Sequence, residues 1–344
     1  MTLSAPLLVV GPSWVGDMIM AQSLFIALAR RHPGVAIDVL APAWSEPLLA
    51  RMPEVRRSLV MPLGHGELKL RLRWQLGRQL AQEGYGQAIV LPNSLKSALV
   101  PWFAGIPRRT GWRGELRYGL LNDLRRLDEA RYPLMVERFL ALGEAPGARL
   151  PDPLPRPRLQ ADAEAARALL RELGLAEQSL VAFCPGAEFG PSKRWPEAHF
   201  ARLAEGLMAA GHHVLLFGSS NDQPVAAELI RALPSALHGQ CTDLTGRTSL
   251  GEAIDLLSTA RLVVSNDSGL MHVAAALDRP LVALYGSTSP DFTPPLGDRV
   301  RVLRIALDCA PCFQRHCPLG HHRCMRELEP ERALAAASEL LEAG

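Results

Sequence analysis

Short runs of consecutive apolar residues alternate along the chain with longer segments in which apolar positions recur every three or four residues. The run Leu7–Val10 is followed by such a segment over Met18–Arg31 and then by a second apolar run at Ala36–Leu40. Apolar runs of this length predict β-strands, and the longer spacing predicts amphipathic helices. The order strand, helix, strand indicates a parallel sheet with crossover helices.

The alternation continues with a predicted strand near Ser58–Met61, a helix across Glu67–Gln82 and a strand at Gln87–Leu91. Five prolines then fall between Pro146 and Pro157. Proline removes backbone donors and favours an extended spacer over a helix or a central strand. We therefore expect one domain over residues 1–150 and a second over residues 151–329.

The alternation starts again after the prolines, so the second half is predicted to be another α/β domain. Its last helix, within residues 330–344, could pack on either domain. Two doubly wound domains facing each other would leave a ligand cleft between the carboxyl ends of both sheets, so the loops after strands should carry the chemistry. The predicted strands are Leu180–Phe183, His213–Phe217, Leu262–Ser265 and Leu281–Leu284, and the predicted helices are Ala161–Leu173, Pro196–Ala210, Asp222–Ala232, Leu250–Thr259, Gly269–Leu277 and Pro330–Ala343.

Composition narrows the class of protein. A chain of 344 residues exceeds one ordinary core, and 48% apolar with 21% charged residues excludes disorder and fibrous repeats. Neither a membrane-spanning apolar run nor a signal sequence is present, so a cytoplasmic protein is expected. The 37 Lys and Arg against 35 Asp and Glu do not give the basic field of a nucleic-acid binder.

The loop Gly11–Asp17 follows the first predicted strand and opens a helix. Its glycine spacing matches neither the dinucleotide fingerprint nor a P-loop. Asp17 falls at the helix N-terminus, where the dipole favours an ionised carboxylate. Two interpretations stay open: a carboxylate that only caps the helix, or a general base that accepts a proton from an incoming hydroxyl.

The loop Cys184–Pro196 follows the first strand of the second domain and contains the adjacent cations Lys193 and Arg194 before a helix that begins at proline. Cations and free amides at a helix start suit an anionic ligand, whereas the alternative is a solvated loop.

Two further loops follow predicted strands. In the segment Ser265–His272, the small residues Asp267, Ser268 and Gly269 could present amides to a diphosphate, and His272 lies one turn into the next helix. In the other loop, Asp222 could bind a ribose hydroxyl or cap the helix that follows.

Four cysteines fall within sixteen residues, at Cys309, Cys312, Cys317 and Cys324. The spacing matches no common zinc knuckle, so a structural metal site, reduced thiols and a redox pair all stay open. The chain contains no Asp-x-Asp pair, no G-x-S-x-G elbow and no H-E-x-x-H helix. A metal-bridged diphosphate site and the hydrolase classes therefore lose support.

Taken together, six segments resemble the ADP-heptose:lipopolysaccharide heptosyltransferases in order along nearly the whole chain. The resemblance implies an inverting glycosyltransferase of the Gram-negative cytosol with two Rossmann-like domains, the GT-B fold. It implies transfer of heptose from ADP-L-glycero-β-D-manno-heptose to the first heptose of the lipopolysaccharide inner core, without a cofactor. The segments are Gly11–Met18, Ala41–Trp44, Leu91–Ser94, Arg109–Glu115, Pro185–Pro196 and Asn266–His272.

The resemblance also assigns residues. It implies that Asp17 is the base, that Lys193 binds phosphate, and that the acceptor is Kdo-lipid A carrying one heptose, reached at the cytoplasmic face of the inner membrane. The implied donor-binding residues are Ser13, Glu188, Lys193, Asp222, Thr248, Asp267, Ser268, Gly269 and His272, and the acceptor candidates are Asn93, Arg109, Arg113 and Arg117.

Several alternatives stay open. Another family member with a different acceptor, including heptosyltransferase I, would share the donor residues. A sugar-nucleotide epimerase of the same fold would need no acceptor, and a binding module would show no turnover. The basic residues Lys69, Arg71 and Arg73 could contact an anionic membrane surface or form an ordinary exposed helix face.

Overall fold

The computed structural model describes residues 5–64 and 66–343. The chain divides into an N-terminal unit, Met1–Leu159, and a C-terminal unit, Gln160–Gly344. Along the chain, the boundary between the units falls after the five prolines, between Leu159 and Gln160, and not between residues 150 and 151. Both Nε2 and Oε1 of Gln22 bond the backbone of Arg158, at 2.6 and 2.9 Å, and these bonds hold the end of the segment on the N-terminal unit.

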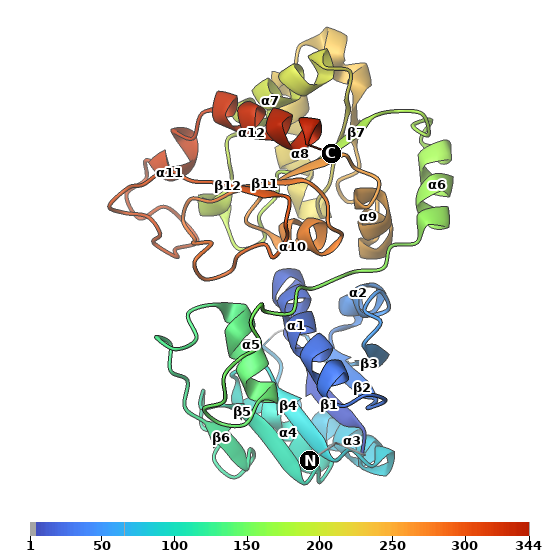
Figure 1. The fold of residues 1–344 in the computed structure, drawn as a ribbon, viewed down its shortest axis with the longest axis vertical. Helices are drawn as coiled ribbons and strands as arrows, with labels where there is room; N and C mark the ends of the chain where they lie inside the picture. Colours follow the sequence, from blue (N-terminus) through green and yellow to red (C-terminus); the bar gives the residue numbers. More distant parts are fainter. Residues whose placement is uncertain (1–4, 65, 344) are drawn as a thin grey trace. The chain divides into compact units, whose positions relative to one another are not determined.

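The N-terminal unit contains a parallel six-stranded sheet in the order β3-β2-β1-β4-β5-β6 (Figure 1). The central strand β1 is buried along its whole length because apolar side chains cover both of its faces. The strands are β1 Leu7–Val10, β2 Ile37–Ala41, β3 Val55–Val60, β4 Gln87–Val90, β5 Arg108–Trp112 and β6 Asp123–Arg125, and the helices are α1 Val15–Arg31, α2 Glu46–Leu49, α3 Leu70–Leu80, α4 Leu99–Phe103 and α5 Met135–Gly143.

The C-terminal unit repeats this topology in a second parallel six-stranded sheet, ordered β12-β11-β10-β7-β8-β9. Counted from the first strand of each unit, both orders are the 3-2-1-4-5-6 order of dinucleotide-binding folds. The strands are β7 Leu180–Cys184, β8 His213–Leu216, β9 Cys241–Asp243, β10 Leu262–Asn266, β11 Leu281–Leu284 and β12 Val300–Leu303, and the helices are α6 Ala163–Glu172, α7 Glu197–Ala209, α8 Gln223–Ala232, α9 Leu250–Leu257, α10 Gly269–Ala276, α11 Arg323–Arg326 and α12 Pro330–Glu342.

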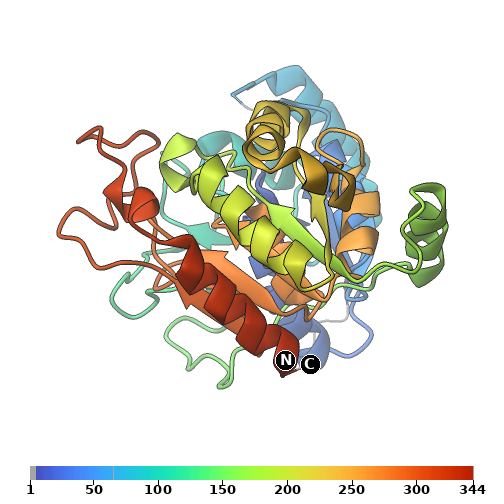
Figure 2. The same cartoon turned by 90° about the horizontal axis from the view of Figure 1, so that it is seen from above.

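The last helix, α12, belongs to the C-terminal unit and lies beside α7 over the sheet (Figure 2). Ala333, Ala337 and Leu340 enter the same buried cluster as Phe183 and Leu207. The α/β fold class with two doubly wound sheets is therefore confirmed. In the described part of the chain, no helix is both long and apolar enough to cross a bilayer.

Candidate active site

In both sheets the strand order reverses beside the first strand of the unit. β1 lies between β2 and β4, and β7 lies between β8 and β10. Open α/β sheets bind ligands beyond the carboxyl ends of the strands at this point. Asp17 and Asn93 follow β1 and β4, while Lys193 and Asp267 follow β7 and β10. Within each unit, the loops that the sequence indicated thus come from the two strands at the reversal.

An ion pair joins the loops after β7 and β10. Nζ of Lys193 lies 2.6 Å from Oδ2 of Asp267, and the hydroxyl of Thr288 donates to the same oxygen at 2.5 Å. The side chain of Asp267 is 4% exposed and that of Lys193 is 14% exposed. A buried carboxylate is tolerated when it is paired and hydrogen-bonded. The pair therefore fixes an ammonium group next to the start of α10.

The N-terminus of α10 adds free backbone donors. Ser268 is the N-cap residue, with extended backbone angles of φ −144° and ψ 174°, and makes no side-chain capping bond. Its hydroxyl lies 3.2 Å from that of Ser265 instead. First-turn amides without a side-chain cap can bind an anion, and the helix dipole favours negative charge there. An ammonium group and a helix N-terminus thus lie together, as a diphosphate requires.

His272 lies in this first part of α10 and is buried. Burial lowers the pKa of the imidazole to about 4, with a further lowering by Lys193 that Asp267 opposes. The side chain is therefore neutral near pH 7. It can offer one hydrogen-bond donor and one acceptor to the site, but not a positive charge.

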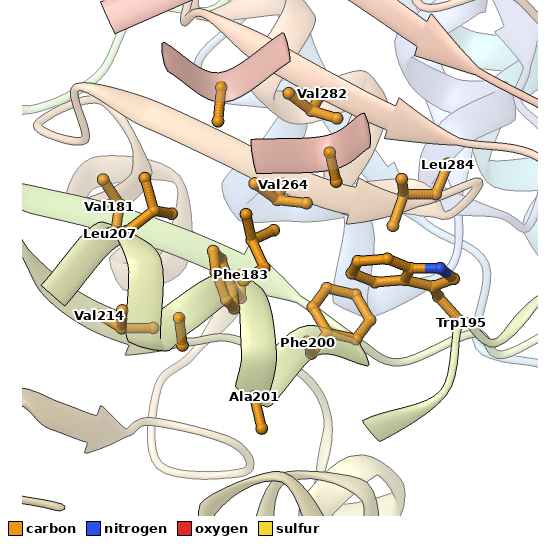
Figure 3. Close-up of a cluster of buried hydrophobic side chains, with 14 of the residues drawn as sticks. Val181, Phe183, Trp195, Phe200, Ala201, Leu207, Val214, Val264, Val282 and Leu284 are labelled. Atoms are coloured by element: carbon orange, nitrogen blue, oxygen red, sulfur yellow. The ribbon is translucent and has the colours of Figure 1, made fainter. Parts of the chain in front are cut away.

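The backbone around the ion pair is held by an asparagine and a tryptophan. The side chain of Asn266 accepts from the Trp195 amide at 3.1 Å and donates to the Pro185 carbonyl at 2.7 Å. The Trp195 indole is fully buried, donates to the Leu328 carbonyl at 2.7 Å and packs edge-on against Phe200 at 4.9 Å (Figure 3). These contacts anchor the loop that carries Lys193 to the core.

Two further residues, Thr288 and Arg315, lie around the ion pair and were not predicted from the sequence. Nζ of Lys193 and Cζ of Arg315 lie 4.9 and 5.6 Å from the centre of the Phe189 ring. The Ser192 amide donates to the Arg315 carbonyl at 3.2 Å, and a Cβ at Gly190 would lie only 2.5 Å from that oxygen. Thr288 follows β11, so its position in a loop after a strand was a signal that could have found it.

Asp222 is the last residue of a short turn, Ser220–Asp222, and its side chain bonds back to Ser219, the residue before the turn. Its Oδ2 accepts from the amide and the hydroxyl of Ser219, both at 2.9 Å. A Cβ at Gly186 or Gly218 would lie under 3 Å from the Asp222 side chain, so these glycines make room for the buried carboxylate. Asp222 is the N-cap residue of α8 but makes no side-chain capping bond to that helix, so the expected cap of the following helix is not formed, and contact with a ribose stays a prediction.

Three other residues predicted to bind the donor lie in loops of the two units. Glu188 and Ser13 are exposed, in the loops after β7 and β1, and Thr248 is half-buried before α9. Their roles in donor binding stay predictions.

Asp17 is the acidic residue of the first turn of α1 and is half-buried. The N-cap residue, Trp14, makes no side-chain capping bond. The positive end of the helix dipole therefore favours the ionised form of Asp17, as a base that accepts a proton requires.

The three arginines predicted to bind the acceptor differ in what they contact. Arg117 is fully buried and donates to the Pro92 carbonyl at 2.6 Å, to the Trp112 carbonyl and to Asn93 Oδ1 at 3.3 Å. Burial lowers its pKa to about 10. The Arg117 guanidinium therefore holds the loop that carries Asn93.

Arg109 is likewise bonded within its own unit. Its guanidinium donates to the carbonyls of Leu120, at 2.6 Å, and Ile106. Burial lowers the pKa of Arg109. Arg113 and Asn93 are exposed, so they are better placed to meet a ligand, and all four acceptor roles stay predictions.

The four clustered cysteines are free thiols. Burial and then the neighbouring Cys312, Cys317 and Cys309 raise the pKa of Cys324, whereas the backbone amide of His322 lowers that of Cys317. Over residues 5–64 and 66–343, no three His, Cys, Asp or Glu side chains are grouped to hold a metal ion. The structure therefore adds no support to a zinc site.

Comparison with known proteins shows a family that covers most of the chain. The model of glycosyltransferase family 9 (heptosyltransferase) matches residues 73–323. Lipopolysaccharide heptosyltransferase 2 of Escherichia coli (strain K12) is 50% identical over 341 residues, which cover 97% of this chain and 98% of the relative. The solved structure of E. coli ADP-heptose lps heptosyltransferase II has a TM-score of 0.89 and 48% identity, covering 98% of this chain and 99% of that chain.

Two more distant likenesses bear on the alternatives. Lipopolysaccharide heptosyltransferase 1 of Pseudomonas aeruginosa PAO1 is 30% identical over 95% of this chain and 92% of the relative. The UDP-GlcNAc 2-epimerase of Methanocaldococcus jannaschii is 13% identical with a TM-score of 0.51, over 87% of this chain and 88% of that chain, which is a likeness of fold alone.

Proposed function

Because this chain belongs to glycosyltransferase family 9, the heptosyltransferases, we propose that it transfers L-glycero-D-manno-heptose from ADP-L-glycero-β-D-manno-heptose to the lipopolysaccharide inner core. The proposed acceptor is Kdo-lipid A that already carries one heptose. The higher identity to heptosyltransferase 2 than to heptosyltransferase 1, 50% against 30%, supports this acceptor. No cofactor is required in the proposal.

The ion pair between Lys193 and Asp267 at the start of α10 is the observation that carries the proposal. When the bond between the anomeric carbon and the diphosphate oxygen breaks, negative charge grows on the diphosphate. The Lys193 ammonium and the amides at Ser268 and Gly269 are placed to stabilise this charge without reorganising. Neutral His272 would add a hydrogen bond rather than a charge.

Asp17 supplies the other half of the proposed reaction. The acceptor hydroxyl oxygen attacks the anomeric carbon on the face opposite the diphosphate, and its proton passes to the Asp17 carboxylate. ADP leaves with the electron pair of the broken bond. A single displacement inverts the anomeric configuration and forms no covalent intermediate with the enzyme.

The loop after β4 is the proposed place for the acceptor. Asn93 and Arg113 are exposed at the carboxyl ends of β4 and β5, where the acceptor's carboxylates and phosphates can meet an amide and a guanidinium. Arg117 donates to Asn93 Oδ1, so in this proposal it positions Asn93 for the acceptor. Arg109 is expected to support this region through its bonds to carbonyls.

The other interpretations differ in what they require. An epimerase would turn over ADP-heptose without an acceptor, and a binding module would turn over nothing. A nicotinamide-dependent dehydrogenase lacks support because the loop after β1 has no G-x-G-x-x-G. The proposed site is cytoplasmic, where the nucleotide-sugar is available, with peripheral contact at the inner membrane.

Incubation with ADP-heptose, with and without a core acceptor bearing one heptose, tests the function through the rate of ADP release. The proposal expects acceptor-dependent release in the natural protein and loss of this release in Asp17→Ala, with ADP binding retained. Turnover without an acceptor would support an epimerase, and binding without turnover in either case would contradict the transferase.

A further inference from the structure

Helix α3 of the N-terminal unit buries an arginine and exposes apolar side chains. Leu70 is 52% exposed and Trp74 is 50% exposed, whereas Arg73 is 4% exposed. Leu68, just before the helix, is also exposed. Leu76 and Leu80 of the same helix do pack on the core, as in an ordinary amphipathic helix, so Leu70 and Trp74 are additional apolar side chains outside the buried stripe. Packing within the unit leaves these two side chains available for contact with another partner.

The buried arginine fixes this orientation. The Arg73 guanidinium donates to the carbonyls of Leu68 at 2.7 Å, Glu67 at 2.9 Å and Lys96 at 3.1 Å. Burial lowers its pKa. On the same face, a Cβ at Gly77 would lie 2.4 Å from Cβ of Phe103, so the glycine permits the close approach of α4. Exposure of Leu70 and Trp74 is thus set by the packing of the opposite face.

Helix α4 also exposes an aromatic side chain, Trp102. α3 and α4 pack against each other (Figure 1), and Trp102 of α4 is 45% exposed. Its ring lies 5.0 Å from that of Phe103, next to the contact with Gly77. We call the exposed side chains of Leu68, Leu70 and Trp74 the α3 surface.

Positive charges surround the α3 surface. Lys69, Arg71 and Arg78 are exposed on the segment that carries its leucines and Trp74. The segment from Leu68 to Leu80 contains no acidic residue, and the nearby Glu67 is paired with Lys69 at 2.7 Å. Exposed tryptophan and leucine side chains between lysines and arginines suit the boundary between acyl chains and anionic head groups.

We propose that the α3 surface docks the N-terminal unit on a bilayer that contains anionic phospholipids. Leu70 and Trp74 enter the interfacial region, and Arg71 and Arg78 bind lipid phosphates. With its 11 residues, α3 lies on the membrane and does not cross it. The proposal corrects the expectation for Arg73, which serves as the internal anchor and not as a lipid-binding cation.

The α3 surface is also connected to the proposed acceptor loop. Lys96, whose carbonyl accepts from Arg73, lies in the short 3-10 helix Leu95–Ala98, which directly follows the loop that holds Asn93. A lipid-anchored acceptor would thus be met by a loop tied to the docked helix. This connection rests on the proposed function, whereas docking rests on the α3 surface alone.

Co-sedimentation of the full chain with vesicles tests docking directly. Vesicles of phosphatidylglycerol and phosphatidylcholine are compared with vesicles of phosphatidylcholine alone, at low and high salt. We expect at least tenfold tighter binding to the anionic vesicles, and weaker binding at high salt. Leu70→Ser with Trp74→Ser, and separately Arg71→Glu with Arg78→Glu, should each weaken binding at least tenfold.

Matched controls use exposed residues of the C-terminal unit. Arg167→Glu with Arg171→Glu reverses two exposed charges on α6, and Leu319→Ser removes one exposed leucine. Neither should change binding to vesicles. Natural protein that does not bind anionic vesicles, or α3 variants that bind as it does, would overturn the proposal.

The transfer rate of the α3 variants tells a failure of the docking proposal apart from a failure of the proposed function. The α3 variants should keep the natural rate on a lipid-free oligosaccharide acceptor, with unchanged circular dichroism. Loss of that rate in the α3 variants alone would indicate a structural role and overturn the docking proposal. Absence of transfer by the natural protein, together with vesicle binding that depends on α3, would contradict the proposed function and leave docking supported.

Discussion

Asp267 holds the ammonium group of Lys193 in an ion pair that is largely withdrawn from solvent, with 2.6 Å between Oδ2 and Nζ. The pair has two consequences. It places a cation at the start of α10, and it makes each partner dependent on the other, because a buried charge without its partner is costly. Variants of Lys193 and Asp267 can therefore distinguish the effect of the ion pair on the reaction rate from its effect on stability.

Lys193→Ala should lower kcat about 10²–10³-fold, the usual loss when one donor to a developing negative charge is removed. It should also lower the free energy of unfolding by about 3 kcal/mol, because Asp267 is left buried and unpaired. The double variant Lys193→Ala with Asp267→Asn should recover most of the stability and none of the rate. Steady-state kinetics and denaturant unfolding measure the two effects, and equal recovery of both would contradict the account.

Asp17→Asn should lower kcat about 10²–10⁴-fold, because the amide cannot accept the proton of the acceptor hydroxyl. Affinity for ADP, measured by calorimetry, should stay within about twofold of the natural value.

The matched control for Asp17 is Asp162→Asn, which changes an aspartate at the N-terminus of another helix, α6. Asp162 Oδ1 accepts from the Glu164 and Ala165 amides, so this variant should affect stability alone. If Asp17→Asn retained the natural kcat, Asp17 would be a capping residue and not the base.

His272 should make stability depend on pH. The folded protein lowers its pKa from 6.5 to about 4, so between these values the unfolded chain binds a proton that the folded chain does not. The free energy of unfolding should therefore fall as the pH falls from about 6.5 to about 4, by up to about 3 kcal/mol from this residue.

Comparison of the natural protein with His272→Gln isolates this contribution. The variant should show a smaller decrease in stability over the same pH range, measured by denaturant unfolding. His316→Gln, at an exposed position, controls for the loss of an imidazole. Parallel pH profiles for the natural protein and His272→Gln would show that the folded protein does not disfavour the charged imidazole.

Substitution of Arg117 should lower the stability of the protein, whereas substitution of Arg113 should weaken acceptor binding. Arg117→Ala leaves the Pro92 and Trp112 carbonyls without their donor and should cost about 2–3 kcal/mol of unfolding free energy. Arg113→Ala changes an exposed residue and should leave stability within about 0.5 kcal/mol, while raising KM for the acceptor. The opposite pattern, a stable Arg117→Ala and an unstable Arg113→Ala, would refute this assignment of the two arginines.

The central strands could be predicted from the sequence because their side chains are apolar on both faces. Leu7–Val10 is an uninterrupted apolar run, and β10, Leu262–Asn266, begins with the apolar run 262–264; both strands are buried throughout. Two of the edge strands, β6 and β12, give no such signal. Arg301 interrupts β12, and β6 consists of Asp123, Leu124 and Arg125. Neither strand was predicted, because charged side chains can reach solvent or each other at the edge of a sheet.

The sequence was enough to predict which loops carry the candidate site, but not which side chains contact one another there. Loops after β7 and β10 follow from strand order, so Lys193 and Asp267 could be found before the structure. Which carboxylate caps a turn and which guanidinium is buried depends on packing between distant segments. For this reason the bonds of Asp222 to Ser219 and the burial of Arg117 could not be predicted from the sequence, and the roles of both residues in ligand binding stay predictions.

Mass analysis of the acceptor tests the central claim most directly. The purified protein is supplied with ADP-heptose and either Kdo-lipid A without heptose or the same acceptor with one heptose. The account predicts a gain of one heptose on the second acceptor, none on the first, and no gain on either with Asp17→Asn. Heptose added to the heptose-free acceptor would contradict the proposed acceptor, and no gain on either would contradict the proposed transfer.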